Sequence, residues 1–345
     1  MMRNKFLHFF QVLAVGVLIR LIISYNFYGT DDVAAWEGFS HYAWNKSPYN
    51  ASIGYNYSPL WFFVIKLCGE IAHFTDLPFH FVIKLPMIVA DVLIYKLLSE
   101  KWENAHLFFL NPVSVLCTSY GGQFDCISLL FLVLSVFWNS CWLSLSILAK
   151  HFTILLLPIF FFAKKRYALL AVPFFLSFLP YISDIKHIIK QVFLYNAHVG
   201  YSELSTVVSK LVFLVSGQNI IDNIPQTNIV LYLAIALLPL FIKWFDIIDK
   251  ILIVFLTYYV FTTQIAPQYY VWVLPFAVLR PKFLIAYSVL STAHLLSFYL
   301  WHYFNLLGQN PMIAENLFLI TKHVLWFGCV AWFVSILMER RHGKV

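Results

Sequence analysis

The apolar run FLHFFQVLAVGVLIRLIIS (residues 6–24) lies near the start of the chain, and the acidic motif GTDD (residues 29–32) follows it closely. A helix needs about 20 predominantly apolar residues to cross a bilayer, so this run predicts a membrane-spanning helix over 6–24. Basic residues precede the run, but no small-residue cleavage site separates it from the polar segment. We therefore interpret residues 1–24 as a retained first span and not as a cleaved signal peptide.

The composition indicates a membrane protein. Of the 345 residues, 61% are apolar and only 11% are charged, whereas soluble domains have about 45–50% apolar and about 25% charged residues. This excludes a soluble enzyme, a disordered chain and a nucleic-acid binder, and the net charge of +7 fits cations at the ends of spans. We predict an all-α polytopic membrane protein with one transmembrane domain over residues 1–345.

Apolar runs along the chain predict about ten to twelve transmembrane helices. The runs cover residues 6–24, 59–75, 79–98, 105–118, 122–138, 141–163, 167–184, 226–245, 247–263, 269–280, 283–304 and 316–338.

Two of these runs, 105–118 and 141–163, leave the threading open. If each is a single span, residues 121–125 are cytoplasmic. If 141–163 is broken near Lys150, then residues 121–125 and Lys150 both reach the extracytoplasmic side. Asn111-Pro112 permits such a break, because proline removes a helix hydrogen bond.

Two long polar stretches interrupt the apolar pattern, at residues 25–58 and 183–226. Both contain segments typical of helices that lie in the membrane interface. Lysines and arginines near residues 164–166 and 280 predict cytoplasmic loops there. Both long stretches and residues 264–269 are then extracytoplasmic, so that three polar elements converge on one membrane face.

The adjacent acids Asp31 and Asp32 are the first candidates for catalysis. A carboxylate at the membrane surface among aromatic side chains can act as a general base. The alternative is a helix cap, because Thr30 and Asp31 precede a helical pattern and acids in a first turn suit the helix dipole. The two roles do not exclude each other.

Ionisable residues inside apolar runs are costly and indicate function by default. Lys84 and Asp91 are seven positions apart and share a helix face, so they predict an internal ion pair or a lysine that reaches toward the headgroups. A fixed ammonium or guanidinium at the interface is the group that would hold a lipid phosphate. The candidates for that role are Arg20 and Lys150, and Asp125 and His151 are further ionisable candidates.

The motif QIAPQYYVW (residues 264–272) pairs amides with aromatic rings, a combination that binds sugars through their hydroxyls and C–H faces. An aromatic belt at the membrane interface explains the rings equally well but not the two glutamines. The five cysteines are scattered and predict neither disulfides nor a metal site. No motif predicts a phosphate loop.

These motifs, in this order, resemble the integral-membrane glycosyltransferases of the GT-C superfamily. The nearest likeness is to polyprenyl-phosphate-mannose-dependent mannosyltransferases, including the enzyme that adds the first mannose to glycosylphosphatidylinositol. The motifs are GTDD (29–32), KSPY (46–49), YNYSPL (55–60), KLP (84–86), AD (90–91), LNP (110–112), GQFD (122–125), Lys150 and APQYYVW (266–272).

The resemblance implies a GT-C-type bundle and an inverting transfer of a hexose, with mannose preferred, from a polyprenyl- or dolichyl-phosphate donor to a lipid-linked or glycan acceptor. Asp31 is the preferred base, with Asp32 as the other catalytic acid. The family's two spaced acids are replaced here by Gly29 and Asp31, which leaves a divalent metal unsupported. The implied binding residues are Arg20 and Lys150 for the donor phosphate, and Gln123, Asp125, His151, Gln268 and Tyr269 for the sugar or acceptor.

Other functions remain open at the level of sequence. The chain could be a transporter or flippase of a lipid-linked sugar, or a non-catalytic subunit of a membrane glycosyltransferase complex. The expected partners are the lipid-linked donor, the acceptor and the bilayer, without nucleic acid. The expected location is a bacterial inner membrane, or the endoplasmic reticulum in a eukaryote, with the active site extracytoplasmic.

Overall fold

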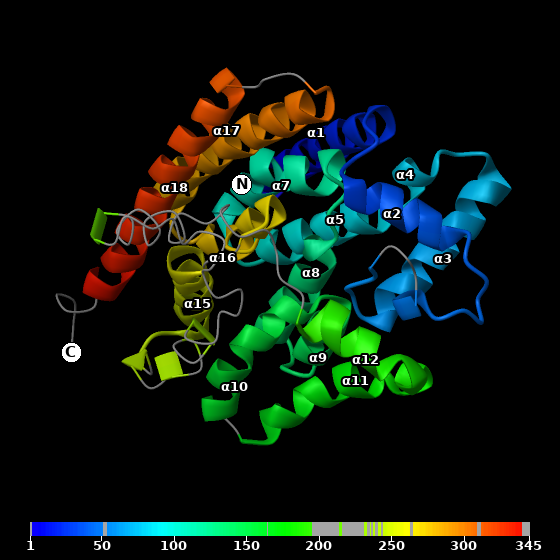
Figure 1. The fold of residues 1–345 in the computed structure, drawn as a ribbon. Coiled ribbons are helices and arrows are strands. Elements are labelled where there is room, and N and C mark those ends of the chain that lie inside the picture. The colour runs from blue at the N-terminus through cyan, green and yellow to red at the C-terminus, as the bar shows by residue number, and fades with distance from the viewer. Residues whose placement is uncertain are drawn as a thin grey trace. The chain divides into compact units, whose positions relative to one another are not determined.

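The computed structural model shows an all-helical protein (Figure 1). It describes residues 2–50, 54–163, 165–194, 214–215, 231–232, 235, 237–238, 241–242, 244–262, 265–308 and 312–339, and none of these is in a β-strand. The chain divides into two compact units, Met1–Tyr195 and Asn196–Val345. Each unit is described separately below, and the single transmembrane domain stays a prediction.

The first unit is built around helices α1 (Met2–Asn26), α5 (Leu85–Ser99), α8 (Asp125–Phe137) and α9 (Trp142–Ala149). Helices α1 and α5 run antiparallel: Phe9 stacks on Tyr95 with ring centroids 5.1 Å apart, while the other end of α1 lies beside the start of α5. Helix α8 packs against both α5 and α9. The apolar faces of the four helices therefore form one core.

Between α1 and α5 the chain forms a short helix, a loop and a longer helix. Helix α2 (Asp31–Ser40) packs against α3 (Pro59–Thr75), and the two lie side by side with α4 (Phe79–Val82) in Figure 1. Proline at the first position favours the start of α3, since its missing N–H would have no partner there. Helix α2 lies in the stretch where an interfacial helix is expected, and its place in the membrane interface stays a prediction.

The apolar run 105–118 does not form one helix. It consists of α6 (His106–Phe109), α7 (Pro112–Val115) and a π-helical turn at Leu116–Tyr120. The break falls at Asn111, whose side chain caps α7 by accepting a hydrogen bond from the Val113 N–H at 3.0 Å. Proline at the next position cannot continue the preceding helix.

The run 141–163 is also broken. Helix α9 ends at Lys150, whose backbone is extended (φ −150°, ψ 120°), and a 3-10 helix at His151–Leu156 and helix α10 (Leu157–Ala163) follow. The break that the second of the two threadings requires is therefore present, and the membrane side that this threading assigns stays a prediction. The structure places Lys150 and residues 121–125 together beside the segment that carries Asp31 and Asp32.

The last part of the first unit contains short helical pieces. They are a 3-10 helix at Lys165–Ala171, α11 (Val172–Leu176), a 3-10 helix at Leu179–Asp184, α12 (Ile185–Ile188) and a π-helix at Ile189–Phe193.

The two long polar stretches of the sequence meet within this unit. The Asn50 amide donates to the Asp184 carboxylate, and the His187 ring contacts the Tyr49 carbonyl at 3.2 Å. Residues 183–194 thus lie against the first polar stretch, as expected if both are on one membrane face. The rest of the second stretch, except Leu214 and Val215, lies outside the described residues.

The second unit contains α15 (Ile247–Phe261), a 3-10 helix at Pro267–Val271, α16 (Leu274–Ala277), α17 (Pro281–Leu306) and α18 (Met312–Glu339). The Asp246 side chain caps α15 by accepting from two backbone N–H groups at 2.9 Å. Helices α17 and α18 pack side by side along their length (Figure 1).

The prediction of ten to twelve transmembrane helices is wrong for the part of the chain that the structure describes. Three helices are long and apolar enough to cross a membrane, at Leu7–Asn26, Pro281–Asn305 and Met312–Glu339. A fourth is possible if the pair Leu169–Leu176 and Leu179–Phe193, bent by 64°, is one span. Breaks divide the runs 105–118 and 141–163 into short pieces. Other runs form single helices, such as α3 with 17 residues and α15 with 15, that are shorter than the bilayer requires. The predicted run 226–245 lies largely outside the described residues.

Candidate functional site

Two segments that are distant in sequence cross at the candidate site, residues 27–32 and residues 120–125. Both the backbone N–H and the hydroxyl of Thr30 donate to the Gly121 carbonyl, at 3.2 and 3.1 Å. Gly29 and Gly122 adopt positive φ angles of 117° and 69°, and a Cβ on Gly122 would lie 2.6 Å from a Val33 methyl group. Glycine is required at this crossing because other residues have neither the conformation nor the space.

The acids occupy the first turn of α2, directly after this crossing. Thr30 is the N-cap residue, but its hydroxyl makes no capping bond and binds Gly121 instead. Asp31 is exposed, whereas Asp32 is half-buried and accepts a hydrogen bond from the Gln123 amide at 2.8 Å. The helix dipole favours both negative charges at this position, so the capping and catalytic interpretations remain compatible.

Gln123 links the two crossing segments. Its side-chain nitrogen donates to the Thr30 hydroxyl at 3.0 Å as well as to Asp32. Its side-chain oxygen is buried and has no hydrogen-bond partner among the described residues. A buried carbonyl without a partner costs about 1–3 kcal/mol, so the Gln123 oxygen is suited to accept a hydrogen bond from a bound hydroxyl.

Lys150 and Asp125 form a buried ion pair beside this network. The ammonium lies 2.5 Å from the carboxylate, and the two side chains are 8% and 1% exposed. The ammonium also lies 4.6 Å from the ring centre of Phe124 and 5.9 Å from that of Tyr57. Two predicted site residues are therefore in direct contact, and each reduces the charge that the other presents.

Aromatic rings fill the space between α2, α3 and the start of α8. Phe124 stacks on Trp61 with ring centroids 3.9 Å apart. Trp36 packs edge-on against Trp61 at 5.1 Å and against Phe124 at 5.5 Å. The indole N–H of Trp61 is buried without a partner among the described residues. The aromatic character of the first polar stretch thus serves mainly to pack α2 onto the rest of the unit.

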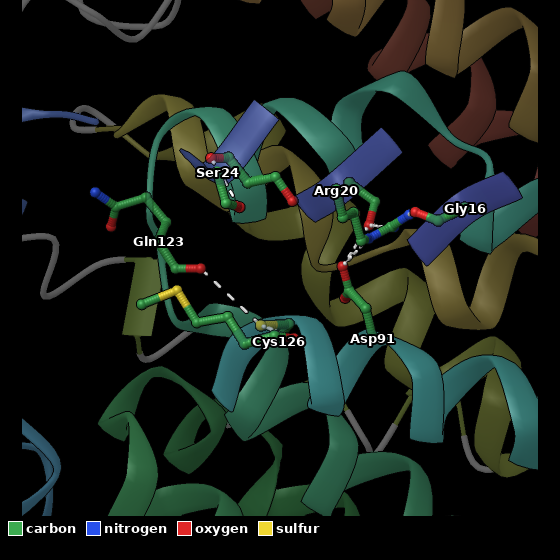
Figure 2. Close-up of polar contacts among 9 residues, drawn as sticks. Gly16, Arg20, Ser24, Asp91, Gln123 and Cys126 are labelled. Atoms are coloured by element: carbon green, nitrogen blue, oxygen red, sulfur yellow. Dashed lines mark hydrogen bonds and ion pairs between the residues drawn. The ribbon is translucent and has the colours of Figure 1, made fainter. Parts of the chain in front are cut away.

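Arg20 is enclosed by protein groups and is not open to a lipid phosphate. Its guanidinium pairs with Asp91 of α5 at 3.0 Å and donates to the Ser114 hydroxyl at 2.9 Å and the Gly16 carbonyl at 3.3 Å. Figure 2 shows Arg20 on α1 pointing toward Asp91, and both side chains are 0% exposed. The geometry gives Arg20 a structural role in place of the predicted phosphate-binding one.

Asp91 therefore pairs with a different cation from the one that its spacing suggested. Lys84, which is two helical turns away, instead donates to the carbonyls of Phe27 and Tyr120 at 2.7 and 3.3 Å. The expected ion pair between Lys84 and Asp91 does not form. A seven-residue spacing shows that two side chains share a face, but it does not show which neighbouring helix lies closer.

Tyr28 and Glu37 form a hydrogen bond at the exposed edge of α2, with the tyrosine hydroxyl as donor. Partial burial and the nearby carboxylate raise the pKa of Tyr28 well above its usual range. The hydroxyl therefore keeps its proton at physiological pH and remains a donor to Glu37.

The other predicted binding residues lie further along the chain. His151 directly follows Lys150 and packs against Phe174 with ring centroids 6.0 Å apart; its Nδ1 atom is buried without a partner among the described residues. Gln268 and Tyr269 are in the 3-10 helix Pro267–Val271 of the second unit, where the Tyr269 ring stacks on Trp272 at 4.3 Å. The binding roles of these three residues stay predictions, and Gln264 lies outside the described residues.

Among the residues that the structure describes, no three histidines, cysteines or acids are grouped so that they could hold a metal ion. Comparisons of the chain with family models, curated proteins and solved structures find no match.

Sequence reasoning missed Lys66 and the role of Thr30. The Lys66 ammonium donates to the carbonyls of Ser40 and Tyr42 at the end of α2. Its position in the middle of the apolar run 59–75 could have identified it, because burying a lysine in apolar surroundings costs free energy and indicates a specific role.

Proposed function

We propose that the chain is an inverting glycosyltransferase of the GT-C type. It transfers a hexose, with mannose as the preferred sugar, from a polyprenyl- or dolichyl-phosphate to a lipid-linked or glycan acceptor at the extracytoplasmic membrane surface. One observation supports the proposal: the first turn of α2, which carries both acids, is held against residues 121–125 by Thr30 and by the bond from Gln123 to Asp32. The same segments carry the motifs that resemble the family.

Asp31 is the proposed general base. It is exposed at the first position of α2, where an acceptor hydroxyl can reach it. Asp31 takes the proton as the hydroxyl oxygen attacks the anomeric carbon from the face opposite the phosphate. The bond between that carbon and the phosphate oxygen breaks, and the phosphate leaves with the electron pair, which inverts the configuration.

Lys150 is the proposed partner of the departing phosphate. An ammonium has three donors, and Asp125 accepts one of them. The sugar phosphodiester is a monoanion in the ground state, and the departing monophosphate gains a second negative charge as the bond breaks. A fixed cation therefore stabilises the transition state more strongly than the ground state, which accelerates the reaction. Asp125 holds the ammonium in place and limits its charge. Arg20 is left out of the proposal because its guanidinium is buried and is bound to Asp91 and Ser114 within the bundle.

The test is sugar transfer in membranes that contain the full chain. Membranes are incubated with radiolabelled polyprenyl-phosphate-mannose and, separately, with the glucose and arabinose analogues, and the labelled products are identified. Asp31→Asn should lower transfer by about 10²- to 10⁴-fold, the range for loss of a general base. The matched control is Glu100→Gln, an exposed acid at the end of α5, which should retain wild-type transfer.

Three outcomes would contradict the proposal: no transfer from any of these donors, equal transfer by Asp31→Asn, or movement of the labelled donor across the membrane without transfer. The last outcome identifies a transporter or flippase of a lipid-linked sugar. Transfer that is lost without the chain but unaffected by Asp31→Asn identifies a non-catalytic subunit.

A further inference from the structure

Two lysines of the first unit are buried without a counter-charge. Lys84 is 0% exposed and Lys66 is 4% exposed, and neither forms an ion pair with an acid among the described residues. Removing an ammonium from water costs several kcal/mol unless other groups compensate. Each of these lysines instead donates to two main-chain carbonyls. All four carbonyls lie close to the acid-bearing helix α2 or to the segment that crosses it.

Lys84 acts on the N-terminal side of α2. Its ammonium donates to Phe27, four residues before Asp31, at 2.7 Å, and to Tyr120, which precedes the Gly121-Gly122 pair, at 3.3 Å. The carbon chain of Lys84 packs directly against Gly122 at the crossing. A Cβ added to Gly122 would lie only 3.1 Å from the Lys84 Cε atom. One side chain therefore fastens both crossing segments to the start of α5.

Lys66 acts on the C-terminal side of α2. Its ammonium, on α3, donates to the carbonyls of Ser40 and Tyr42, where α2 ends. A cation at a helix C-terminus also stabilises the helix dipole. Gly69, on the next turn of α3, permits the close approach, because a Cβ there would lie 2.7 Å from the Ser40 Cβ atom. The two ends of α2 are thus held by ammonium groups from two different helices.

We propose that Lys84 and Lys66 are positioning residues that fix α2, and with it Asp31 and Asp32, relative to residues 120–125. Their effect on the rate of sugar transfer rests on the proposed function. Their effect on the rigidity of α2 does not. A base must lie within hydrogen-bond reach of the proton that it removes, and α2 has only ten residues. A short helix that is released at either end would place its first turn imprecisely.

The mechanical part is tested by amide hydrogen exchange on the purified full chain in lipid nanodiscs. Lys84→Met and Lys66→Met keep an unbranched side chain and remove the donors. Lys84→Met should raise exchange in residues 27–33 and 120–124, and Lys66→Met should raise it in residues 40–44. The matched control is Lys96→Met, an exposed lysine of α5, which should change neither. Unchanged exchange in both lysine variants overturns the proposal.

The catalytic part is tested by separating kcat from KM in the transfer assay. Lys84→Met should lower kcat at least about tenfold with little change in the donor KM, because misplacement of a catalytic group by about 1 Å can cost 10²-fold. If Lys84→Met raises amide exchange in residues 27–33 and 120–124 but leaves kcat unchanged, Lys84 is not a positioning residue for catalysis.

The two proposals fail in different ways. Absence of transfer by the wild-type chain refutes the proposed function, and the exchange data then decide whether the lysines hold α2. If Lys84→Met does not fold, Lys66→Met tests the same proposal at the other end of the helix, with residues 40–44 as its readout.

Discussion

The buried charges of Arg20 and Asp91 in the first unit are held by neighbouring protein groups. The Arg20 guanidinium faces Asp91 and Ser114, and the Ser114 hydroxyl in turn donates to Asp91 at 3.1 Å. Ion pairs of this kind add little net stability, but removal of one member leaves an unpaired charge in an apolar environment. The site's own pair, Lys150 and Asp125, follows the same rule. The charges inside the apolar runs therefore determine which helices pack together.

A double-mutant cycle tests the structural role of Arg20. Arg20→Met alone should lower the free energy of unfolding by about 3–5 kcal/mol, because it leaves the Asp91 carboxylate buried without its cation. Arg20→Met combined with Asp91→Leu should recover most of that loss. The measurement is thermal unfolding in detergent. A folded double variant whose donor KM rises strongly would instead return Arg20 to phosphate binding.

At the scale of elements, the crossing of residues 27–32 and 120–125 depends on its two glycines. Gly29 and Gly122 hold positive φ angles, and the Val33 side chain occupies the space beside both. The tight crossing brings the first turn of α2 to Gln123. A β-carbon at either position would separate the two segments and move the acids away from the rest of the site.

Paired alanine substitutions test this dependence. Gly122→Ala should lower the free energy of unfolding by more than about 1 kcal/mol, since it combines an unfavourable φ angle with a methyl collision. Gly38→Ala is the matched control in α2, where no atom lies within 4 Å of the added Cβ. It should raise the helix stability by up to about 1 kcal/mol. Equal effects of the two substitutions in thermal unfolding would contradict this account.

The helix pattern of the sequence predicts some elements well. Residues 6–24, 283–304 and 316–338 are uninterrupted apolar runs, and they correspond to the long helices α1, α17 and α18. Run 141–163 is also apolar, but the helix breaks at Lys150, whose ammonium pairs with Asp125, 25 residues earlier. A hydropathy pattern reports local composition, and such a long-range contact is invisible to it.

The candidate site was predictable to a similar extent. Asp31, Gln123, Asp125 and Lys150 stand out by type and position, and the structure brings their segments together. The partner of each charge could not be predicted, because spacing defines a shared face only within one helix. Lys84 is the example, because its partners are the carbonyls of Phe27 and Tyr120. Every residue has a main-chain carbonyl, so the sequence does not indicate which of them binds a side chain.

At the scale of the whole molecule, the structure gives a membrane protein with three or four candidate spans. In its first unit, Lys150 and the acids of α2 lie at one end of α8, and the turn with Cys141 follows the other end. The contact between Asn50 and Asp184 adds the second polar stretch to the side of the acids. Side-specific labelling can therefore test this arrangement.

A membrane-impermeant thiol reagent should distinguish the two sides in intact cells. Asn50→Cys, at an exposed position of the first polar stretch, should be labelled without permeabilisation. The native Cys141 is exposed and follows the other end of α8. The predicted threading places it on the cytoplasmic side, so it serves as the matched control that should react only after the membrane is opened. The other cysteines of the chain are buried. Labelling of both cysteines in intact cells would contradict the predicted sidedness.

The ion pair between Arg20 and Asp91 also bears on how the chain enters the membrane during synthesis. The two residues are 71 positions apart, so the ribosome completes the first helix long before it adds the acid that neutralises it. An arginine at the centre of an inserting helix costs about 2.5–3.5 kcal/mol. The apolar residues of the first helix offset this cost, but its guanidinium has no acid partner from α5 until that helix emerges, so early insertion of the first helix is less favourable than its final packing.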